Sequence, residues 1–306
     1  MYDLIIVGGG PAGLTAALYA RRANKTVLVL EKDSFGGQIT YSPRVENIPG
    51  FPSVSGSEFA DRLVEQVLAQ GAEAESCEVT GITDDPAESV KVVHTDMGDY
   101  TARAVILAVG ARHRSLGLPG EEDYLGAGIS FCAVCDGAFY EGKVVGIAGG
   151  GNSALQEALL LADLAREVHV IQNLDALTGE AELRKRLASR TNVRVHLGTV
   201  ISAYRGNADG LTGVVLKSSD GSERELPLDG LFLAVGLEPQ KEPFASLVPL
   251  DERGYIDSDE RCLTGTPGVF AAGDCRRKAV RQVTTAASDG AAAALAACTY
   301  LDSAEA

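Results

Sequence analysis

Two widely separated segments of the sequence share one design: a strand, a glycine-rich turn, a helix and a second strand. The first, YDLIIVGGGPAGLTAALYARRANKTVLVLEK, predicts a buried strand at 3–7, a helix at about 11–23 and a strand at 26–30. The second, KVVGIAGGGNSALQEALLLADLAREVHVIQN, predicts a strand at 143–148, a helix at about 152–165 and a strand at 167–171. Such units build parallel sheets, so we expect an α/β protein with two Rossmann-like, three-layer domains.

Each unit is followed later in the chain by an apolar run that ends in the letters LAVG. The two runs continue as ARHRSLGLPGEED and LEPQKEP, and such Gly-, Pro- and Glu-rich exits indicate crossings between domains. We therefore expect a first domain at 1–115 and 240–306, and a second domain at 116–239 inserted into it.

The charge and composition of the chain indicate which classes of partner it binds and in which cellular compartment it works. The net charge of −15 would repel a phosphate backbone, which argues against nucleic acid. The sequence opens on DLIIV without a basic leader or cleavage site, and the run AAAALAAC is too short to span a membrane. We expect a cytoplasmic protein with no membrane partner, whose six cysteines are catalytic or buried.

The first glycine turn has the features of a dinucleotide site. Gly8 permits a tight turn, Gly10 lets the backbone approach a pyrophosphate, and Gly13 allows the helix to pack closely on the strand. Glu31 ends the second strand, where a carboxylate can accept hydrogen bonds from ribose hydroxyls. The alternative is a purely structural turn, but strand, helix and acid together favour a nucleotide.

The second glycine turn, Gly149, Gly151 and Ala154, is intact, but the strand tip that follows it is not. Gln172 and Asn173 offer neither a carboxylate for a ribose 2′-hydroxyl nor a guanidinium for a 2′-phosphate. Their neutral hydrogen bonds leave weak NADH binding open. The alternative is that this domain keeps its fold only to position the next motif.

That motif is FCAVCDG, which contains Cys132, Cys135 and Asp136. A Cys-x-x-Cys pair can form a disulfide, a helix N-terminus lowers a thiol pKa, and a neighbouring carboxyl group can act as a general acid or base. Zinc needs four ligands, and with neither a second such pair nor ligand spacing among the four histidines we expect no metal. We expect buried thiols at the four other cysteines, Cys77, Cys262, Cys275 and Cys298.

With these residues assembled, the chain resembles the low-molecular-weight flavoprotein thioredoxin reductases along nearly its whole length. The matching motifs are VGGGPAGLTAALYARR, FGGQI with VENIPGFP, LAVGARHRSLGLPGE, FCAVCDG, GGGNSALQEAL and GVFAAGDCRRKAVRQVTTAASDGAAAA. The resemblance implies FAD in the first domain, a pyridine nucleotide in the inserted domain, and a redox-active disulfide on the inserted domain. It also implies a homodimer.

The resemblance also assigns roles to residues. By it, Glu31 would hold the adenosine ribose and Asp274 the ribityl or phosphate groups. Cys135 would be the sulfur nearest the flavin, Cys132 the sulfur that exchanges with the substrate disulfide, and Asp136 the proton donor. The implied FAD-binding set is Gly8, Gly10, Pro11, Ala12, Gly13, Glu31, Gly37, Gln38, Asn47, Gly110, Gly273, Asp274, Arg281, Gln282 and Val283.

The chain departs from NADPH-dependent members at the strand tip. Those members carry a His-Arg-Arg run and a further Arg, where this chain has Gln172, Asn173, Leu174 and Thr178. Each charge-assisted hydrogen bond lost to a 2′-phosphate is worth about 1.5–3 kcal/mol, which argues against NADPH. The chain thus resembles the NADPH-independent branch, that is, ferredoxin-dependent flavin thioredoxin reductases or diflavin-linked disulfide oxidoreductases. The latter make a second flavin a candidate cofactor.

The leading hypothesis is a flavoprotein disulfide oxidoreductase that passes electrons from FAD through Cys132 and Cys135 to a thioredoxin-like protein disulfide. A reduced ferredoxin is a candidate donor, and Arg276, Arg277 and Lys278 could meet its acidic surface; the alternative for them is a solvated loop beside the FAD. Three further hypotheses are an NADH- or NADPH-dependent thioredoxin reductase, a dithiol oxidase that passes electrons to oxygen, and a non-enzymatic flavin-binding redox sensor.

Overall fold

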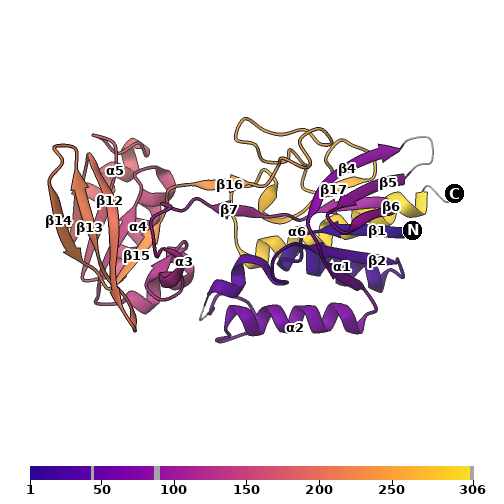
Figure 1. The fold of residues 1–306 in the computed structure, drawn as a ribbon, viewed down its shortest axis with the longest axis horizontal. Helices are drawn as coiled ribbons and strands as arrows, with labels where there is room; N and C mark the ends of the chain where they lie inside the picture. Colours follow the sequence, from indigo (N-terminus) through magenta and orange to yellow (C-terminus); the bar gives the residue numbers. More distant parts are fainter. Residues whose placement is uncertain (43–44, 86–89, 304–306) are drawn as a thin grey trace. The chain divides into compact units, whose positions relative to one another are not determined.

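The structure, a computed structural model, describes every residue except 43–44, 86–89 and 304–306. The chain forms two compact units (Figure 1). The first consists of residues 1–43, 48–112 and 238–306, and the second of residues 44–47 and 113–237. The chain leaves the first unit along β7 (Ala111–His113) and returns along β16 (Leu237–Pro239), and these two strands pair with each other.

The first unit is built on a seven-stranded sheet in the order β3-β2-β1-β6-β5-β4, with β17 paired to β6. Strands β1, β2, β3, β17 and the C-terminal half of β6 are parallel, and β4 and β5 add an antiparallel extension. The strands are β1 (Tyr2–Val7), β2 (Val27–Glu31), β3 (Glu73–Ser76), β4 (Val79–Asp85), β5 (Val90–Thr95), β6 (Gly98–Leu107) and β17 (Val269–Ala271). The helices are α1 (Pro11–Arg22), η1 (Gly37–Tyr41), α2 (Gly56–Ala69), η4 (Gly273–Cys275) and α6 (Val283–Ser303).

Alternate residues of β1 enter two different cores, because successive strand side chains point to opposite faces. Leu4 and Ile6 pack with apolar residues of α1 and α6. Ile5 and Val7 pack on the other face, with residues of β4 and β5 and with the loop that carries Phe244. A strand buried on both faces needs a continuous apolar run, which is what the sequence offers at this position.

The second unit has three layers, with a five-stranded parallel sheet β11-β10-β9-β15-β8 in the middle. Helices α4 and α5 pack on one face, and the antiparallel sheet β12-β13-β14 covers the other. The parallel strands are β8 (Ile129–Ser130), β9 (Val144–Ala148), β10 (Glu167–Ile171), β11 (Val193–His196) and β15 (Gly230–Leu233). The remaining elements are η2 (Glu122–Tyr124), α3 (Ala133–Asp136), η3 (Gly137–Tyr140), α4 (Asn152–Leu164), α5 (Ala181–Ala188), β12 (Thr199–Asn207), β13 (Gly210–Ser218) and β14 (Glu223–Pro227).

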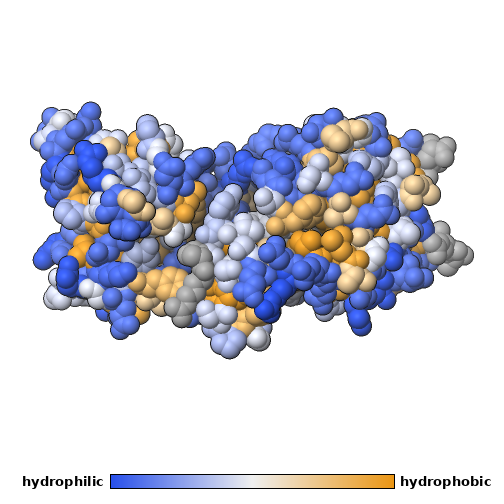
Figure 2. Space-filling view, turned by 60° about the horizontal axis from the view of Figure 1, so that its bottom comes forward, coloured by the Kyte–Doolittle hydropathy of each residue, from blue (hydrophilic) through white to orange (hydrophobic). Residues whose placement is uncertain are grey.

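The predicted α/β class with parallel sheets is confirmed, and both strand–turn–helix–strand units lie where the sequence placed them, with ends shifted by one residue. Among the described residues, no helix is long and apolar enough to cross a membrane. The face drawn in Figure 2 carries mostly hydrophilic residues with smaller hydrophobic patches between them, as the high net charge of the chain predicts.

Candidate active site

The Cys-x-x-Cys motif forms a disulfide between Cys132 and Cys135 in the second unit. Cys132 is the N-cap residue of α3, and its Sγ accepts a hydrogen bond from Cys135 N at 3.1 Å. Both cysteines are half-buried, while Val134 between them is exposed. The sulfur pair therefore lies at the start of a short helix.

Asp136 lies directly after the pair and is held by Ser130. Ser130 Oγ donates to Asp136 Oδ2 at 2.6 Å and accepts from Cys132 N at 3.1 Å. Asp136 Oδ1 is buried and makes no hydrogen bond to a described residue. Burial raises the pKa of Asp136, and the hydrogen bond from Ser130 opposes this rise. An acid with one unpaired, covered oxygen is suited to hold a proton beside the sulfurs.

A second acid, Glu157 on α4, contacts the same turn and was not predicted from the sequence. Its Oε2 accepts a hydrogen bond from Ala133 N, the residue after Cys132, at 3.3 Å. Burial raises the pKa of Glu157 to about 7, and the hydrogen bond from Ala133 opposes the rise. The signal available in the sequence was its place on the helix, three residues after Ala154 on the inward side.

In the first unit, the glycine turn after β1 is shaped by close backbone contacts. Gly8 has φ +108°, and a Cβ at this position would lie 2.3 Å from Ala108 O. A Cβ on Gly13 would lie 1.9 Å from Gly8 O, so the helix and the strand approach too closely for any side chain. Gly10 meets no such obstacle, since its nearest neighbour in that direction is 4.0 Å away. The cradle is therefore built of bare backbone, which an anion can approach at the N-terminus of α1.

Glu31 contacts the same turn through its side chain. Its Oε2 accepts from Gly9 N at 2.7 Å, and its Oε1 accepts from Asp33 N at 2.9 Å. The loop that follows also returns to the turn, because Gly36 N donates to Gly9 O at 2.8 Å. The acid at the strand tip is thus fixed in place by backbone groups, and its binding of a ribose stays a prediction.

Three further predicted residues surround the N-terminus of α1. Gly37 has φ +65°, and a Cβ on it would lie 3.2 Å from Gly10 Cα. Gln38 Nε2 donates to Ala111 O at 2.6 Å, one residue after Gly110. Gly273 has φ +79°, and a Cβ on it would lie 2.8 Å from the Cβ of Ala12. The structure therefore brings the segments around Gly10, Gly37 and Gly273 together.

Asp274 follows Gly273 and presents an unpaired acceptor. Its Oδ1 is buried and makes no hydrogen bond to a described residue. Burial raises the pKa of Asp274, while the charges of Lys278 and Arg281 lower it. Bare glycine backbone at one end and a carboxylate oxygen without a hydrogen bond at the other fit the pyrophosphate and the hydroxyl-rich chain of FAD.

The remaining predicted flavin residues divide between the two units. Arg281 Nε donates to Asp274 O at 3.4 Å, and its guanidinium lies 4.2 Å from the centre of the Tyr255 ring. Gln282 immediately precedes α6, which begins at Val283. Asn47, in contrast, belongs by its contacts to the second unit, so the structure does not group it with the others.

The second glycine turn has the same backbone geometry as the first. Gly149 has φ +127°, and a Cβ on it would lie 2.4 Å from Ala234 O. Gln172 at the strand tip is buried against Gly150, and its Nε2 donates to Ala176 O at 3.3 Å. Thr178 N donates to Gly150 O at 2.8 Å. Gln172 and Thr178 thus stabilise their own loop, and neither supplies a positive charge.

Of the two interpretations of Arg276, Arg277 and Lys278, the structure gives little support to an exposed basic surface. Arg276 is buried, the Lys278 side chain is only 9% exposed, and the two pair with Asp289 at 3.1 and 2.8 Å. Arg277 is exposed, but it pairs with Asp257 at 3.0 Å. A run of basic letters cannot reveal that a helix later in the chain supplies the carboxylate that neutralises two of them.

The four other cysteines are free and buried, as predicted: Cys77, Cys262, Cys275 and Cys298. Burial raises the pKa of each thiol above its usual range. Within the described part of the chain, no cluster of His, Cys, Asp or Glu could hold a metal ion.

Comparison with known proteins gives consistent results. Residues 2–290 match the family model described as pyridine nucleotide-disulphide oxidoreductase. A thioredoxin reductase from Treponema pallidum is 42% identical over 98% of this chain and 97% of its own length. One from Listeria innocua is 40% identical over 99% of this chain and 94% of its own length. The crystal structure of thioredoxin reductase from Streptococcus pyogenes superposes with a TM-score of 0.94 at 38% identity, covering 99% of both chains.

Proposed function

Because this chain belongs to the pyridine nucleotide-disulphide oxidoreductase family and is a flavoprotein disulfide oxidoreductase of thioredoxin reductase type, we propose that the Cys132–Cys135 pair carries electrons from FAD to a protein disulfide such as that of thioredoxin. In this proposal residues 1–115 and 240–306 form the FAD-binding domain, and residues 116–239 form the inserted domain that carries the disulfide. The observation that carries it is the Cys132–Cys135 disulfide with the buried Asp136 directly behind it.

FAD would be held by the turn at Gly8–Gly13, by Glu31 and by Asp274, and bound FAD would supply the two electrons that open the disulfide. The Cys132 thiolate then attacks the substrate disulfide, forms a mixed disulfide and releases one substrate thiolate. Cys135 next attacks the sulfur of Cys132, which releases the second substrate sulfur and restores the starting disulfide. Asp136 holds the proton that the departing thiolate takes up, since its burial keeps it protonated at a higher pH than usual.

We further propose that NADPH is not a tight donor. Asn173 and Leu174 are exposed and uncharged, and Gln172 and Thr178 are tied into their own loop, so none of them can pair with a 2′-phosphate. The intact turn at Gly149 favours a dinucleotide without that phosphate, that is, NADH. A ferredoxin donor has less support, because Arg276 and Lys278 are paired internally. A second flavin stays a prediction of the resemblance.

Two variants test the disulfide step. We expect Cys132→Ser and Cys135→Ser to reduce turnover of a thioredoxin disulfide at least about a thousandfold, because each removes a sulfur that must form a covalent bond. Bound flavin, measured by its absorbance, should stay unchanged. Turnover that survives either substitution would contradict the proposal. Oxygen uptake driven by a dithiol would indicate a dithiol oxidase, and partner binding that changes without any turnover would indicate a redox sensor.

The donor is tested by anaerobic titration of the holoprotein with NADPH, NADH and reduced ferredoxin while the flavin band is followed. We expect NADH to bleach the band at lower concentration than NADPH. Bleaching by micromolar NADPH would show that the strand tip has been misread, and bleaching by ferredoxin alone would assign the protein to the nicotinamide-independent reductases. The homodimer stays a prediction of the resemblance, and light scattering of the purified protein tests it. The cytoplasmic location stays a prediction from the sequence.

A further inference from the structure

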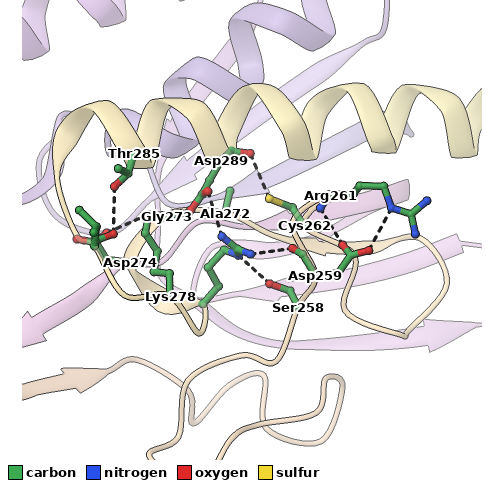
Figure 3. Close-up of polar contacts among 12 residues, drawn as sticks. Ser258, Asp259, Arg261, Cys262, Ala272, Gly273, Asp274, Lys278, Thr285 and Asp289 are labelled. Atoms are coloured by element: carbon green, nitrogen blue, oxygen red, sulfur yellow. Dashed lines mark hydrogen bonds and ion pairs between the residues drawn. The ribbon is translucent and has the colours of Figure 1, made fainter.

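The loop between η4 and α6 carries buried charges that the proposed flavin contacts do not explain. Arg276, Lys278 and Asp289, here called the loop ion cluster, are joined by ion pairs to the Asp289 carboxylate. Figure 3 shows Lys278 and Asp289 beside Gly273 and Asp274. Burying charged groups is costly unless each is paired and hydrogen-bonded. Because this cluster lies next to the candidate cofactor site, we ask whether it contributes to cofactor binding.

Asp289, on the second turn of α6, is the centre of the cluster. Its Oδ2 accepts from Lys278 Nζ at 2.8 Å and from Gly273 N at 3.1 Å, and its Oδ1 accepts from Arg276 Nη1 at 3.1 Å. Its side chain is only 14% exposed. One carboxylate thus fixes both the backbone of Gly273 and the cation four residues beyond Asp274.

Arg276 ties the cluster to a second loop. Its Nε donates to Ser258 Oγ at 2.8 Å, and its Nη2 donates to Asp259 O at 2.7 Å. Every guanidinium nitrogen therefore has an acceptor, which fixes the side chain in one orientation. Arg276 anchors the loop, and Lys278 is left as the group that faces Asp274.

Lys278 lies between two carboxylates. Its Nζ is 2.8 Å from Asp289 Oδ2 and 3.8 Å from Asp274 Oδ1, the second distance being an ion pair too long for a hydrogen bond. The lysine thus attracts the inner, covered oxygen of Asp274 without bonding to it. The Asp274 side chain is 33% exposed although its Oδ1 is covered. The other carboxylate oxygen, Oδ2, is therefore the one that a ligand can reach.

We propose that the loop ion cluster positions Asp274, with Lys278 attracting its covered oxygen so that the other oxygen is free to accept from a hydroxyl group of the FAD ribityl chain. Asp289 and Lys278 are then positioning residues for the cofactor. The inference rests on the FAD site proposed above. An ionised carboxylate accepts a stronger hydrogen bond from a hydroxyl group than a neutral acid does, so removal of the lysine charge should weaken FAD binding.

The test measures FAD release from the purified holoprotein on dilution, by the fluorescence of free FAD. We expect Lys278→Met to raise the FAD dissociation constant about tenfold or more, and Lys278→Arg, which keeps the charge, to restore most of the affinity. Asp274→Asn should also weaken binding. In the Asp274→Asn background, Lys278→Met should add less than about a twofold change, because its effect passes through Asp274.

Arg277→Gln is the matched control, since it removes the neighbouring exposed ion pair with Asp257, and it should leave FAD affinity unchanged. Thermal unfolding of each holoprotein identifies variants that fail to fold. If Lys278→Met lowers the unfolding temperature without changing FAD affinity, or if its effect is equal in both backgrounds, the cluster is structural only and the inference is wrong. A wild-type protein that binds no FAD would overturn the flavin assignment together with this inference.

Discussion

The two glycine-rich units have nearly the same turn and end in different strand tips. In both, the first glycine packs against a backbone carbonyl oxygen. A Cβ on Gly8 would lie 2.3 Å from Ala108 O, and a Cβ on Gly149 would lie 2.4 Å from Ala234 O. In both, the loop after the second strand donates to the carbonyl of the middle glycine, Gly9 or Gly150. At the strand tip the first unit has Glu31, and the second unit has Gln172 in the equivalent place. The backbone geometry of each turn therefore fits a phosphate group. The side chain at the strand tip, Glu31 or Gln172, determines which groups are available to bind the ribose.

The helices that follow the two turns also differ on their inward faces. Ala16 on α1 is fully buried in the core that contains residues of α6. The equivalent position on α4 is Glu157, which contacts the turn that carries the disulfide. Helix α1 thus presents a small side chain that packs closely in the core, whereas α4 presents a carboxylate to the turn that carries the disulfide.

Substituting the matching glycine in each unit should give the largest contrast. We expect Gly8→Ala to abolish FAD binding, because the new methyl group would clash with Ala108 O at a φ that alanine rarely adopts. Gly149→Ala should leave the flavin bound and remove only dinucleotide binding. Flavin absorbance per protein measures the first effect, and NADH titration measures the second.

Gly221→Ala controls for backbone strain alone, since Gly221 has φ +85° and open space around it. If Gly149→Ala also releases the flavin, the two turns do not act independently.

Adding positive charge at the second strand tip should convert its specificity. We expect Asn173→Arg with Leu174→Arg to tighten NADPH binding relative to NADH at least about tenfold to a hundredfold, because even one new charge-assisted bond to a 2′-phosphate is worth about 1.5–3 kcal/mol. Isothermal titration with both dinucleotides measures the ratio. Ala208→Arg with Thr212→Arg adds the same two charges at other exposed sites of this unit and should leave the ratio unchanged. An unaltered ratio in the double variant would show that ribose recognition lies elsewhere.

Glu157 should make the free energy of unfolding depend on pH. Ala16, at the equivalent position of α1, has no group that can titrate. Burial raises the pKa of Glu157 from 4.5 to about 7, so the ionised form is disfavoured in the folded protein. Its contribution to the free energy of unfolding is therefore complete below pH 4.5 and is lost as the pH rises through 7. We expect Glu157→Gln to reduce the fall in unfolding temperature between pH 5 and pH 7.

Burial also raises the pKa of Asp136, and this acid keeps its own contribution in the Glu157→Gln variant. Gln156→Ala, on the exposed side of α4, is the control and should leave the pH profile as it is. A profile that is identical in wild type and Glu157→Gln would mean that this carboxylate is solvated.

The smallest expected effect on stability comes from the second strand of each unit. The position that holds Leu28 in β2 holds His169 in β10. Arg224 Nη2 lies 2.8 Å from His196 Nδ1, and His196 Nε2 lies 2.9 Å from His169 Nδ1. Burial lowers the pKa of His169, and lowers that of His196 to about 4. Stability from this neutral pair is present above pH 6.5 and lost as the pH falls toward 4.

His169 is buried and His196 is half-buried, so solvent still screens part of the pair, and we expect a loss on the order of 1 kcal/mol. Denaturant unfolding of wild type and His196→Gln at pH 7 and pH 5 measures it, and the variant should lose less stability at pH 5. An equal loss in both proteins would rule out the histidine pair as its source.

The sequence by itself determined the features that depend on neighbours along the chain. Apolar runs, glycine spacing and the Cys-x-x-Cys pair predicted both nucleotide-binding folds and the disulfide, because strand burial, turn geometry and a short cysteine loop are local properties. The missing cations at the strand tip were also visible in the letters alone.

Only the tertiary structure decided which charges meet. Arg276 and Lys278 looked like a basic surface, yet Asp289 neutralises them from a helix that begins several residues later. Glu157 looked like an ordinary helix residue, yet the fold places it against Ala133. Pairing and burial of a charged side chain depend on residues distant in sequence, and the cost of burying an unpaired charge makes that partner decisive.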